Sequence, residues 1–313
     1  MSEVKKIATR DSYGNALKEL AEEYPDLIVL DADLSNATKT LTFKKAYPDR
    51  FFDCGIAEAN MMGIAAGLAT CGKIPFASTF AMFASGRAFE QVRNSIGYPH
   101  LNVKIGATHA GITVGEDGAS HQCLEDLALM RTIPGMVVMN PADDIEVKAA
   151  VKAALDYVGP VYLRFGRAAC PVINDNPDYH FEIGKGTLLR EGKDVSIIAT
   201  GICVANALEA AELLAAEGID AEVINICTIK PLDEELILQS AKKTGCVVTA
   251  EEAFIAGGLG GAVAELLSEK LPTRQYRIGI RDRFGESGTA QGLVEKYELD
   301  GKGICRQVKE FLK

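Results

Sequence analysis

The sequence predicts an α/β fold made of two doubly wound, mostly parallel-sheet domains. Apolar strand-like runs alternate with helix-like runs along most of the 313 residues, a pattern typical of a parallel sheet with helices on both faces. A segment rich in Pro, Asn and Asp interrupts this alternation, which then starts again. The chain is also longer than the chains that fold around a single hydrophobic core. We therefore expect a first domain over 1–168, a linker over 169–187 and a second domain over 188–313.

The elements of the first half follow from apolar spacing and from end signals. An apolar stripe at helical spacing predicts a helix over 10–24, which Asp11 can cap and Pro25 ends. The helix expected over 57–71 contains small residues such as Gly63, which cost helix propensity. They favour close packing against another helix, in this chain or in a partner. The other expected helices are 38–47, 85–96, 124–131 and 141–157, and the expected strands are 27–30, 51–52, 74–80, 101–107, 136–139 and 161–165.

The second half repeats the alternation after the linker. Its loop 256–261 is glycine-rich but does not form a GxGxxG pattern, so we assign it no dinucleotide role. Helix–sheet packing is enough to explain these glycines. The expected strands are 195–200, 221–226, 247–251 and 276–280, and the expected helices are 204–217, 233–243 and 259–270, with two more from about residue 289.

Composition excludes several classes of protein. The net charge is −10 and no long basic run is present, which argues against nucleic acid or an anionic membrane as a partner. We find no signal peptide and no apolar run that approaches the roughly 18 residues of a membrane span. The eight cysteines are scattered without a CxxC pair, which favours reduced core thiols in a cytoplasmic protein.

The stretch 53–60, Asp-Cys-Gly-Ile-Ala-Glu-Ala-Asn, joins a strand to the helix over 57–71. Glu58 therefore falls near a helix N-terminus, where backbone N–H groups and the helix dipole stabilise an anion. Two interpretations stay open. Glu58 either caps its helix or moves a proton, because ligands of open α/β sheets bind beyond the carboxyl ends of the strands.

Further polar residues collect at predicted strand ends of the first domain. Two of the four histidines flank the glycine-rich loop 110–122, and imidazoles with a carboxylate can move protons near neutral pH. Arginines can bind a phosphate through a planar fork. A flexible loop argues against a preformed metal site, and GxSxG, P-loop and HExxH motifs are absent. The candidates, which suit small sugars or acids as substrates, are Arg10, Ser35, Glu58, His109, Asp117, His121 and Arg167.

Four motifs resemble the transketolase family. They are the stretch 53–60, Ser-Thr-Phe-Ala-Met-Phe at 78–83, Ala-Thr-His at 107–109 and Gly-Glu-Asp-Gly-Ala-Ser-His-Gln at 115–122. The resemblance runs from about residue 5 to the end, and implies the family's pyrimidine-binding domain followed by its C-terminal domain. It also implies thiamine diphosphate as cofactor and transfer of a two-carbon ketol unit. The donor would be a ketose phosphate such as xylulose 5-phosphate, and the acceptor an aldose phosphate such as ribose 5-phosphate.

The resemblance assigns the cofactor contacts. Glu58 matches the family's Glu that hydrogen-bonds N1′ of the aminopyrimidine ring and so assists loss of the proton at the thiazolium C2. Phe83 matches a ring-stacking Phe, and Phe80 lines the same pocket, although core packing is the alternative for both. Gly86 stands where the family has a Tyr, which leaves that pocket contact open.

The resemblance to the transketolase family also assigns the substrate contacts. His121 matches a histidine that contacts the C1 hydroxyl and carbonyl oxygen of the donor, and Asp117 matches an Asp that reads the C2 hydroxyl of the acceptor. The phosphate contacts would come from His109, Arg10 and Ser35, and from a strand-end arginine that is Arg167 or Arg164, with spacing in favour of Arg167.

One family motif is absent. The family holds the diphosphate and a divalent cation through a GDG…N motif in an N-terminal domain, and this sequence has no Gly-Asp-Gly. The chain thus resembles the C-terminal half of a split transketolase. We expect a separate N-terminal subunit to hold Mg²⁺ and the diphosphate, a cytoplasmic α2β2 heterotetramer, and no activity from the lone chain. Whether the product serves pentose phosphate metabolism or a specialised pathway stays open.

Three alternatives remain. Half of a 1-deoxyxylulose-5-phosphate synthase shares the turn at 53–60, but that family has an Asp-Arg pair where Thr108 and His109 stand. The β subunit of a 2-oxo acid dehydrogenase has this domain order without the 115–122 motif. A non-enzymatic regulatory homologue is disfavoured, because Glu58, Phe83 and both loop histidines are present together.

Overall fold

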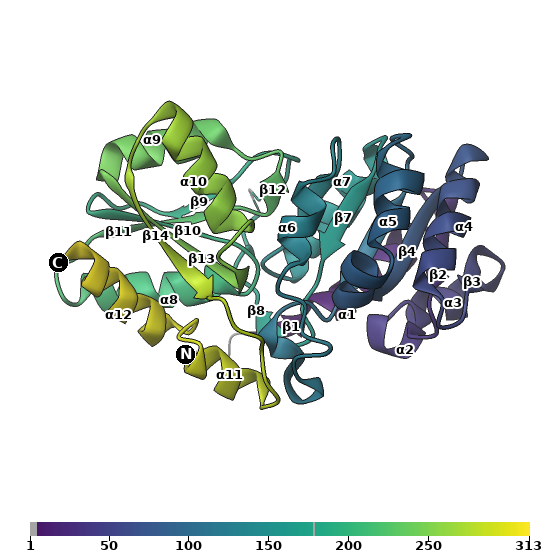
Figure 1. The fold of residues 1–313 in the computed structure, drawn as a ribbon, viewed down its shortest axis with the longest axis horizontal. Coiled ribbons are helices and arrows are strands. Elements are labelled where there is room, and N and C mark those ends of the chain that lie inside the picture. The colour runs from purple at the N-terminus through teal and green to yellow at the C-terminus, as the bar shows by residue number, and fades with distance from the viewer. Residues whose placement is uncertain (1–4, 178) are drawn as a thin grey trace.

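The computed structural model describes residues 5–177 and 179–313, and shows two α/β domains side by side (Figure 1). This confirms the predicted fold class. Residues 1–4 of the expected first domain and Asp178 of the expected linker lie outside the described residues. Within the described part of the chain, no helix is both long enough and apolar enough to cross a membrane.

The first domain is built on a seven-stranded sheet with the order β12-β6-β7-β5-β4-β2-β3. Six of its strands pair in parallel, so their carboxyl ends meet at one edge of the sheet, where ligands of such sheets bind. These strands are β2 (Leu27–Asp31), β3 (Phe51–Asp53), β4 (Ile74–Phe80), β5 (Lys104–Thr108), β6 (Val137–Met139) and β7 (Val161–Arg164).

Helices cover both faces of this sheet. On one face α1 (Thr9–Leu20) and α7 (Asp144–Asp156) pack over a core that includes Leu17, Phe76 and Val147. On the other face α4 (Glu58–Thr70) and α6 (Asp126–Arg131) bury Met61, Met62 and Leu127. That second cluster continues into the C-terminal domain, so one apolar cluster spans both domains, while further clusters belong mainly to one domain each.

Two predicted helices are irregular. The expected helix over 38–47 is shorter, as α3 (Leu41–Ala46), and a separate turn of helix, α2 (Ser35–Thr38), precedes it and ends at Lys39, whose φ is 71°. The expected helix over 85–96 consists of π-helical turns at Phe83–Arg87 and Val92–Gly97 around the short α5 (Phe89–Gln91). Such π-turns occur frequently at functional sites.

The second domain has a five-stranded sheet with the order β14-β13-β10-β11-β9, in which only the β9 pairing is antiparallel. Helices again lie on both faces (Figure 1). The strands are β9 (Thr187–Arg190), β10 (Val195–Ala199), β11 (Ala221–Asn225), β13 (Cys246–Phe254) and β14 (Arg274–Ile280), and the helices are α8 (Cys203–Ala215), α9 (Glu234–Thr244), α10 (Leu259–Lys270), α11 (Ala290–Lys296) and α12 (Gly301–Leu312).

The join between the domains is more ordered than a free linker. The expected linker begins with a strand, β8 (Ala169–Pro171), which pairs antiparallel with β1 (Lys6–Ala8). The Asp143 carboxylate then accepts the backbone N–H groups of Ile173 and Asn174, both at 2.7 Å. Farther along the chain, β12 (Thr228–Lys230) leaves the second domain and pairs antiparallel with β6 at the edge of the first sheet. The expected linker is thus fastened to the first domain, and the second half of the chain adds a strand to the first sheet.

Candidate active site

Glu58 is the first residue of α4 and its side chain is 1% exposed. The turn before it is fixed by the Asp53 carboxylate, which accepts the backbone N–H groups of Asp33 and Gly55 at 3.1 and 3.0 Å. Gly55 has a φ of 68°, a left-handed conformation that glycine adopts at little cost. The strand-to-helix turn therefore presents a buried carboxylate at the carboxyl edge of the sheet.

The partner of Glu58 is Arg87, a residue that the sequence analysis did not select. Its Nη1 atom lies 3.0 and 2.9 Å from the two carboxylate oxygens of Glu58. Its guanidinium carbon lies 4.3 Å from the centre of the Phe83 ring. The signal that could have found it is the four-residue spacing between Phe83 and Arg87, which places two side chains on one helical face.

The structure brings four predicted aromatic side chains together. The rings of Phe80 and Phe83 are stacked, with centroids 5.7 Å apart. The ring centroids of His109 and Phe80 are 3.8 Å apart in a stacked arrangement, and those of His121 and Phe83 are 5.6 Å apart in an edge-to-face arrangement. One continuous wall thus joins the environment of Glu58 to both loop histidines.

His109 is held in one neutral form. Its Nε2 lies 2.9 Å from Arg10 Nη1, which can only donate, so Nε2 accepts. The proton must then be on Nδ1, which donates to Thr108 Oγ1 at 2.9 Å. Burial first, and then the charges of Arg10 and Arg167, together lower the pKa of His109 to about 3. His109 is therefore uncharged at neutral pH.

Several cations lie around His109. The charges of Arg10, Arg167 and Lys39 all act on its imidazole. Arg10 also donates to the carbonyl of Ala37 at 3.2 Å, in the same short helix as the half-buried Ser35. Among the described residues, the buried Nε of Arg10 has no hydrogen-bond partner. A positive cluster with a free donor, in a chain of net charge −10, suits an anionic substituent such as a phosphate.

Lys39 belongs to this cluster although the sequence analysis passed over it. The segment before it is anchored by the buried Asp31, whose carboxylate accepts from Leu34 N, Thr38 Oγ1 and Thr40 Oγ1 at 2.6, 2.7 and 2.8 Å. No motif marks Lys39. Its position depends on the fold around Asp31.

The loop 110–122 is fixed by the second domain. Thr113 N donates to the Glu252 carboxylate at 2.6 Å, and Gln122 Nε2 donates to the carbonyl of Glu286 at 2.9 Å. Burial raises the pKa of Glu252 to about 7. Asp117 is exposed at the tip of the loop, and His121 is half-buried, with Nδ1 3.0 Å from Ser120 Oγ. The expectation of a flexible loop therefore needs correction: second-domain residues anchor the segments on both sides of Asp117.

The two candidate strand-end arginines have different environments. Arg164 is 3% exposed and donates to the Asp126 carboxylate at 2.9 Å and to the carbonyl of Glu252 at 2.9 Å. Arg167 is 35% exposed, pairs with Glu116 at 3.0 Å and donates to the carbonyl of Val114. Arg164 is thus committed to buried partners, whereas Arg167 faces the loop and the cationic cluster.

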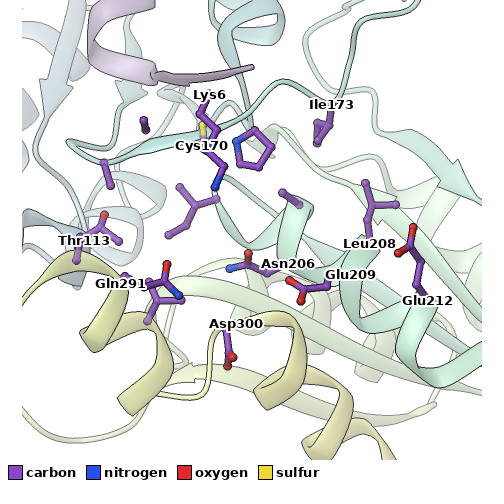
Figure 2. Close-up of a pocket in the computed structure, with 17 residues that line it drawn as sticks. Lys6, Thr113, Cys170, Ile173, Asn206, Leu208, Glu209, Glu212, Gln291 and Asp300 are labelled. Atoms are coloured by element: carbon purple, nitrogen blue, oxygen red, sulfur yellow. The ribbon is translucent and has the colours of Figure 1, made fainter. Parts of the chain in front are cut away.

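Two cavities differ in their relation to this site. A cavity of about 580 Å³ lies between the domains, lined by groups such as Lys6, Asn206 and Glu209 (Figure 2). It contains neither Glu58 nor a loop histidine. A cavity of about 350 Å³ is lined by Phe83 and Arg87 and is therefore next to the buried carboxylate. Among residues 5–177 and 179–313, no cluster of three His, Cys, Asp or Glu side chains is arranged to hold a metal ion.

Comparisons with known proteins agree with this geometry. The family model described as "Transketolase, pyrimidine binding domain" matches residues 5–172, and the one described as "Transketolase, C-terminal domain" matches residues 184–304. A putative transketolase C-terminal section of Methanocaldococcus jannaschii is 54% identical, over 97% of this chain and 96% of its own length. A 6-deoxy-6-sulfo-D-fructose transketolase subunit of a Clostridium species is 49% identical, over 96% of this chain and 93% of its own length.

More distant and structural relatives extend the comparison. A 1-deoxy-D-xylulose-5-phosphate synthase of Geobacter sulfurreducens is 41% identical over 96% of this chain, which spans 47% of that enzyme. A solved structure, described as a split-gene transketolase in an inactive β4 tetramer, superposes with a TM-score of 0.91 at 57% identity and covers 98% of each chain. The chain therefore belongs to the transketolase family, in which it corresponds to the C-terminal section of a split enzyme.

Proposed function

We propose that this chain is the C-terminal subunit of a thiamine-diphosphate-dependent transketolase. It would transfer a two-carbon ketol unit from a ketose phosphate, such as xylulose 5-phosphate, to an aldose phosphate, such as ribose 5-phosphate. The observation that carries the proposal is the buried carboxylate of Glu58, which contacts the same guanidinium as the Phe83 ring, together with the aromatic wall that joins Phe83 to His109 and His121.

The residues present fit the aminopyrimidine ring of this cofactor. The guanidinium of Arg87 already pairs with Glu58 and covers Phe83, so the space between these side chains accepts a planar, nitrogen-bearing group. Glu58 would hold a ring nitrogen and move its proton, Phe83 would stack on the ring, and Phe80 would support Phe83. When bound, thiamine diphosphate supplies a nucleophilic thiazolium carbon and an electron sink for the two-carbon unit.

The loop and the cationic cluster suit the substrates. His121, which packs edge-to-face with Phe83, would contact the C1 hydroxyl and carbonyl oxygen of the donor, and Asp117 the C2 hydroxyl of the acceptor. Arg10, Arg167 and Ser35 would bind the terminal phosphate, and His109, the other phosphate candidate, would orient Arg10 through Nε2. Since neutral His109 accepts from Arg10 through Nε2, the charge that meets the phosphate comes from the arginines.

The proposal requires an N-terminal subunit that carries a GDG…N motif and holds Mg²⁺ with the diphosphate. Large apolar side chains are exposed on both sides of Glu58 in the sequence: Phe52 is 47% exposed, Ile56 76% and Ile64 39%. Exposed apolar residues that gather in one segment are expected at a subunit interface. We propose a cytoplasmic α2β2 assembly, with reduced cysteines as the sequence suggests, and no activity from this chain alone.

The identity of the sugars is part of the test. The Clostridium relative is described as a transketolase of a sulfonated sugar, and a sulfonate is an anion that the cationic cluster would also attract. The Geobacter relative is described as a 1-deoxy-D-xylulose-5-phosphate synthase, which makes pyruvate with glyceraldehyde 3-phosphate the competing substrate pair. Thr108 and His109, in place of that family's Asp-Arg pair, favour ketol transfer.

Reconstitution tests the proposal. Ketol transfer from xylulose 5-phosphate to ribose 5-phosphate would be measured with thiamine diphosphate and Mg²⁺, for this chain, for the N-terminal subunit from the same source, and for their mixture. We expect turnover in the mixture alone. Turnover by this chain alone would contradict the proposal, and turnover of the mixture with pyruvate but not with xylulose 5-phosphate would support the synthase instead.

A further inference from the structure

Arg87 lies on the two side chains that the proposed function assigns to the cofactor ring. Its Nη1 atom is 2.9 Å from one carboxylate oxygen of Glu58 and 3.0 Å from the other, and its guanidinium carbon is 4.3 Å from the centre of Phe83. A guanidinium is planar, donates N–H bonds and stacks on aromatic faces. An aminopyrimidine ring is also planar and stacks in the same way, so both groups compete for one carboxylate and one ring face.

The two members of the ion pair differ in exposure. The side chain of Glu58 is 1% exposed, whereas that of Arg87 is 50% exposed. A buried carboxylate without a partner is strongly destabilising, so Glu58 needs a partner at all times. Arg87 loses little when its guanidinium moves into water, because half of its surface is already there. The arginine is therefore the member of the pair that can leave.

Space for this movement lies beside the pair. Arg87 and Phe83 line a cavity of about 350 Å³ together with Gly86, Ser120 and Phe284. Gly86 has no side chain to obstruct the arginine. The cavity lies between Arg87 and second-domain residues such as Phe254 and Phe284, so it gives the guanidinium room to move away from Glu58.

We propose that Arg87 is a placeholder for the aminopyrimidine ring, which neutralises Glu58 in the absence of the cofactor and leaves both Glu58 and Phe83 when the cofactor binds. The inference rests on the proposed function and deepens it, because it makes Arg87 a determinant of cofactor affinity. If the pair is closed in about nine of ten cofactor-free molecules, it weakens the apparent affinity about tenfold.

Binding of the cofactor to the assembled complex tests the inference without any turnover. Thiamine diphosphate with Mg²⁺ would be titrated calorimetrically into complexes that contain the wild-type chain, Arg87→Met or Arg93→Met. Methionine keeps the apolar stem and removes the donors and the charge. Arg93 is the matched control, because it is exposed in the same segment and bonds Asn94 rather than Glu58.

We expect Arg87→Met to bind the cofactor roughly tenfold more tightly than wild type, and Arg93→Met to bind it as wild type does. An unchanged or weaker affinity for Arg87→Met would overturn the inference and leave the proposed function intact. A wild-type complex that binds no thiamine diphosphate would overturn the proposed function, and the inference with it.

A double-mutant cycle on the cofactor-free complex tests the ion pair separately. The thermal midpoints of Glu58→Gln, Arg87→Met and the double variant would be compared with wild type. We expect Arg87→Met to lower the midpoint, because it leaves a charged Glu58 buried, and Glu58→Gln to restore much of the loss. Additive effects of the two substitutions would show that the pair does not stabilise the cofactor-free state, and would contradict the placeholder role.

Discussion

Glu58 in the first domain and Glu251 in the second are buried carboxylates on similar folds, yet they are held by different kinds of partner. Glu251, in β13, is 0% exposed and accepts the backbone N–H groups of Leu259 and Gly260, both at 2.8 Å, in the first turn of α10. Glu58 is equally buried but is held by the side chain of Arg87. Backbone donors cannot leave, whereas a half-exposed side chain can.

The kind of partner separates Glu251, a structural carboxylate, from Glu58, a carboxylate that can receive a ligand. Gly258, directly before α10, strengthens this contrast. A Cβ at Gly258 would collide with the Glu251 carboxylate, so this loop is shaped to hold a carboxylate of its own chain. Glu58, at the start of α4, is held among the described residues by one exchangeable partner, Arg87. We therefore expect substitutions in the first domain to affect binding and turnover, and those at Glu251 to affect stability.

The largest effect is expected from Glu58→Gln. Loss of a group that moves a proton typically lowers turnover by about 10²- to 10⁴-fold, and the amide keeps the shape of the side chain. The measurement is turnover of the reconstituted enzyme, with Glu251→Gln as the matched control that should keep its turnover. Equal losses for the two variants would remove the distinction between the domains.

Arg10→Gln should have the next largest effect. A charge-assisted hydrogen bond to a phosphate contributes about 1.5–3 kcal/mol, so KM for ribose 5-phosphate should rise roughly ten- to hundredfold. KM for an unphosphorylated aldose should change little. A similar rise with both acceptors would mean that Arg10 supports the site rather than binds the phosphate.

Glu251→Ala should leave turnover intact and reduce stability. It leaves two backbone N–H groups at the start of α10 without their acceptor, which costs about 1–3 kcal/mol for each group. Urea unfolding measures this loss, with Glu265→Ala, an exposed residue of the same helix, as control. A stability equal to that of wild type would show that Glu251 is not the structural member of the comparison.

The smallest effect concerns pH. Burial raises the pKa of Glu251 to about 7 from an ordinary value of 4.5. The folded state therefore keeps this proton to higher pH than the unfolded state, and the associated stability is present below pH 4.5 and lost as the pH rises through 7. Glu251→Gln does not titrate at this position. The free energy of unfolding of wild type should therefore fall relative to that of Glu251→Gln as the pH rises from 4.5 to 7. A free energy of unfolding of wild type that rises relative to Glu251→Gln over this pH range would mean that folding lowers the pKa of Glu251 instead.

The fold class could be predicted because local patterns determine it. The alternation of apolar strands and amphipathic helices is visible in short windows, and the turn at 53–60 marks Glu58 as a strand-to-helix residue. The addition of β12 to the first sheet could not be foreseen, since Thr228–Lys230 pairs with residues about ninety positions earlier in the chain. No local pattern encodes such a partner.

The candidate site was predictable in part for the same reason. His109 and His121 were selected by motif, but their neighbours depend on tertiary structure. Arg87 lies in a stretch that the sequence predicts as an ordinary helix, and Glu252 lies in β13, just past the end of the strand predicted over 247–251. Both act across distances that spacing does not reveal: Arg87 reaches Glu58, and Glu252 reaches Thr113 in the other domain.

The most direct test of the account is a structure of the assembled complex with thiamine diphosphate and Mg²⁺. We predict that Glu58 contacts the aminopyrimidine ring, that Phe83 stacks on it, and that the Arg87 nitrogens lie beyond the roughly 4 Å limit of an ion pair with Glu58. Glu251 should keep its bonds to Leu259 and Gly260. A cofactor ring bound elsewhere, with Arg87 still paired to Glu58, would contradict the central claim that Glu58 is the carboxylate open to a ligand.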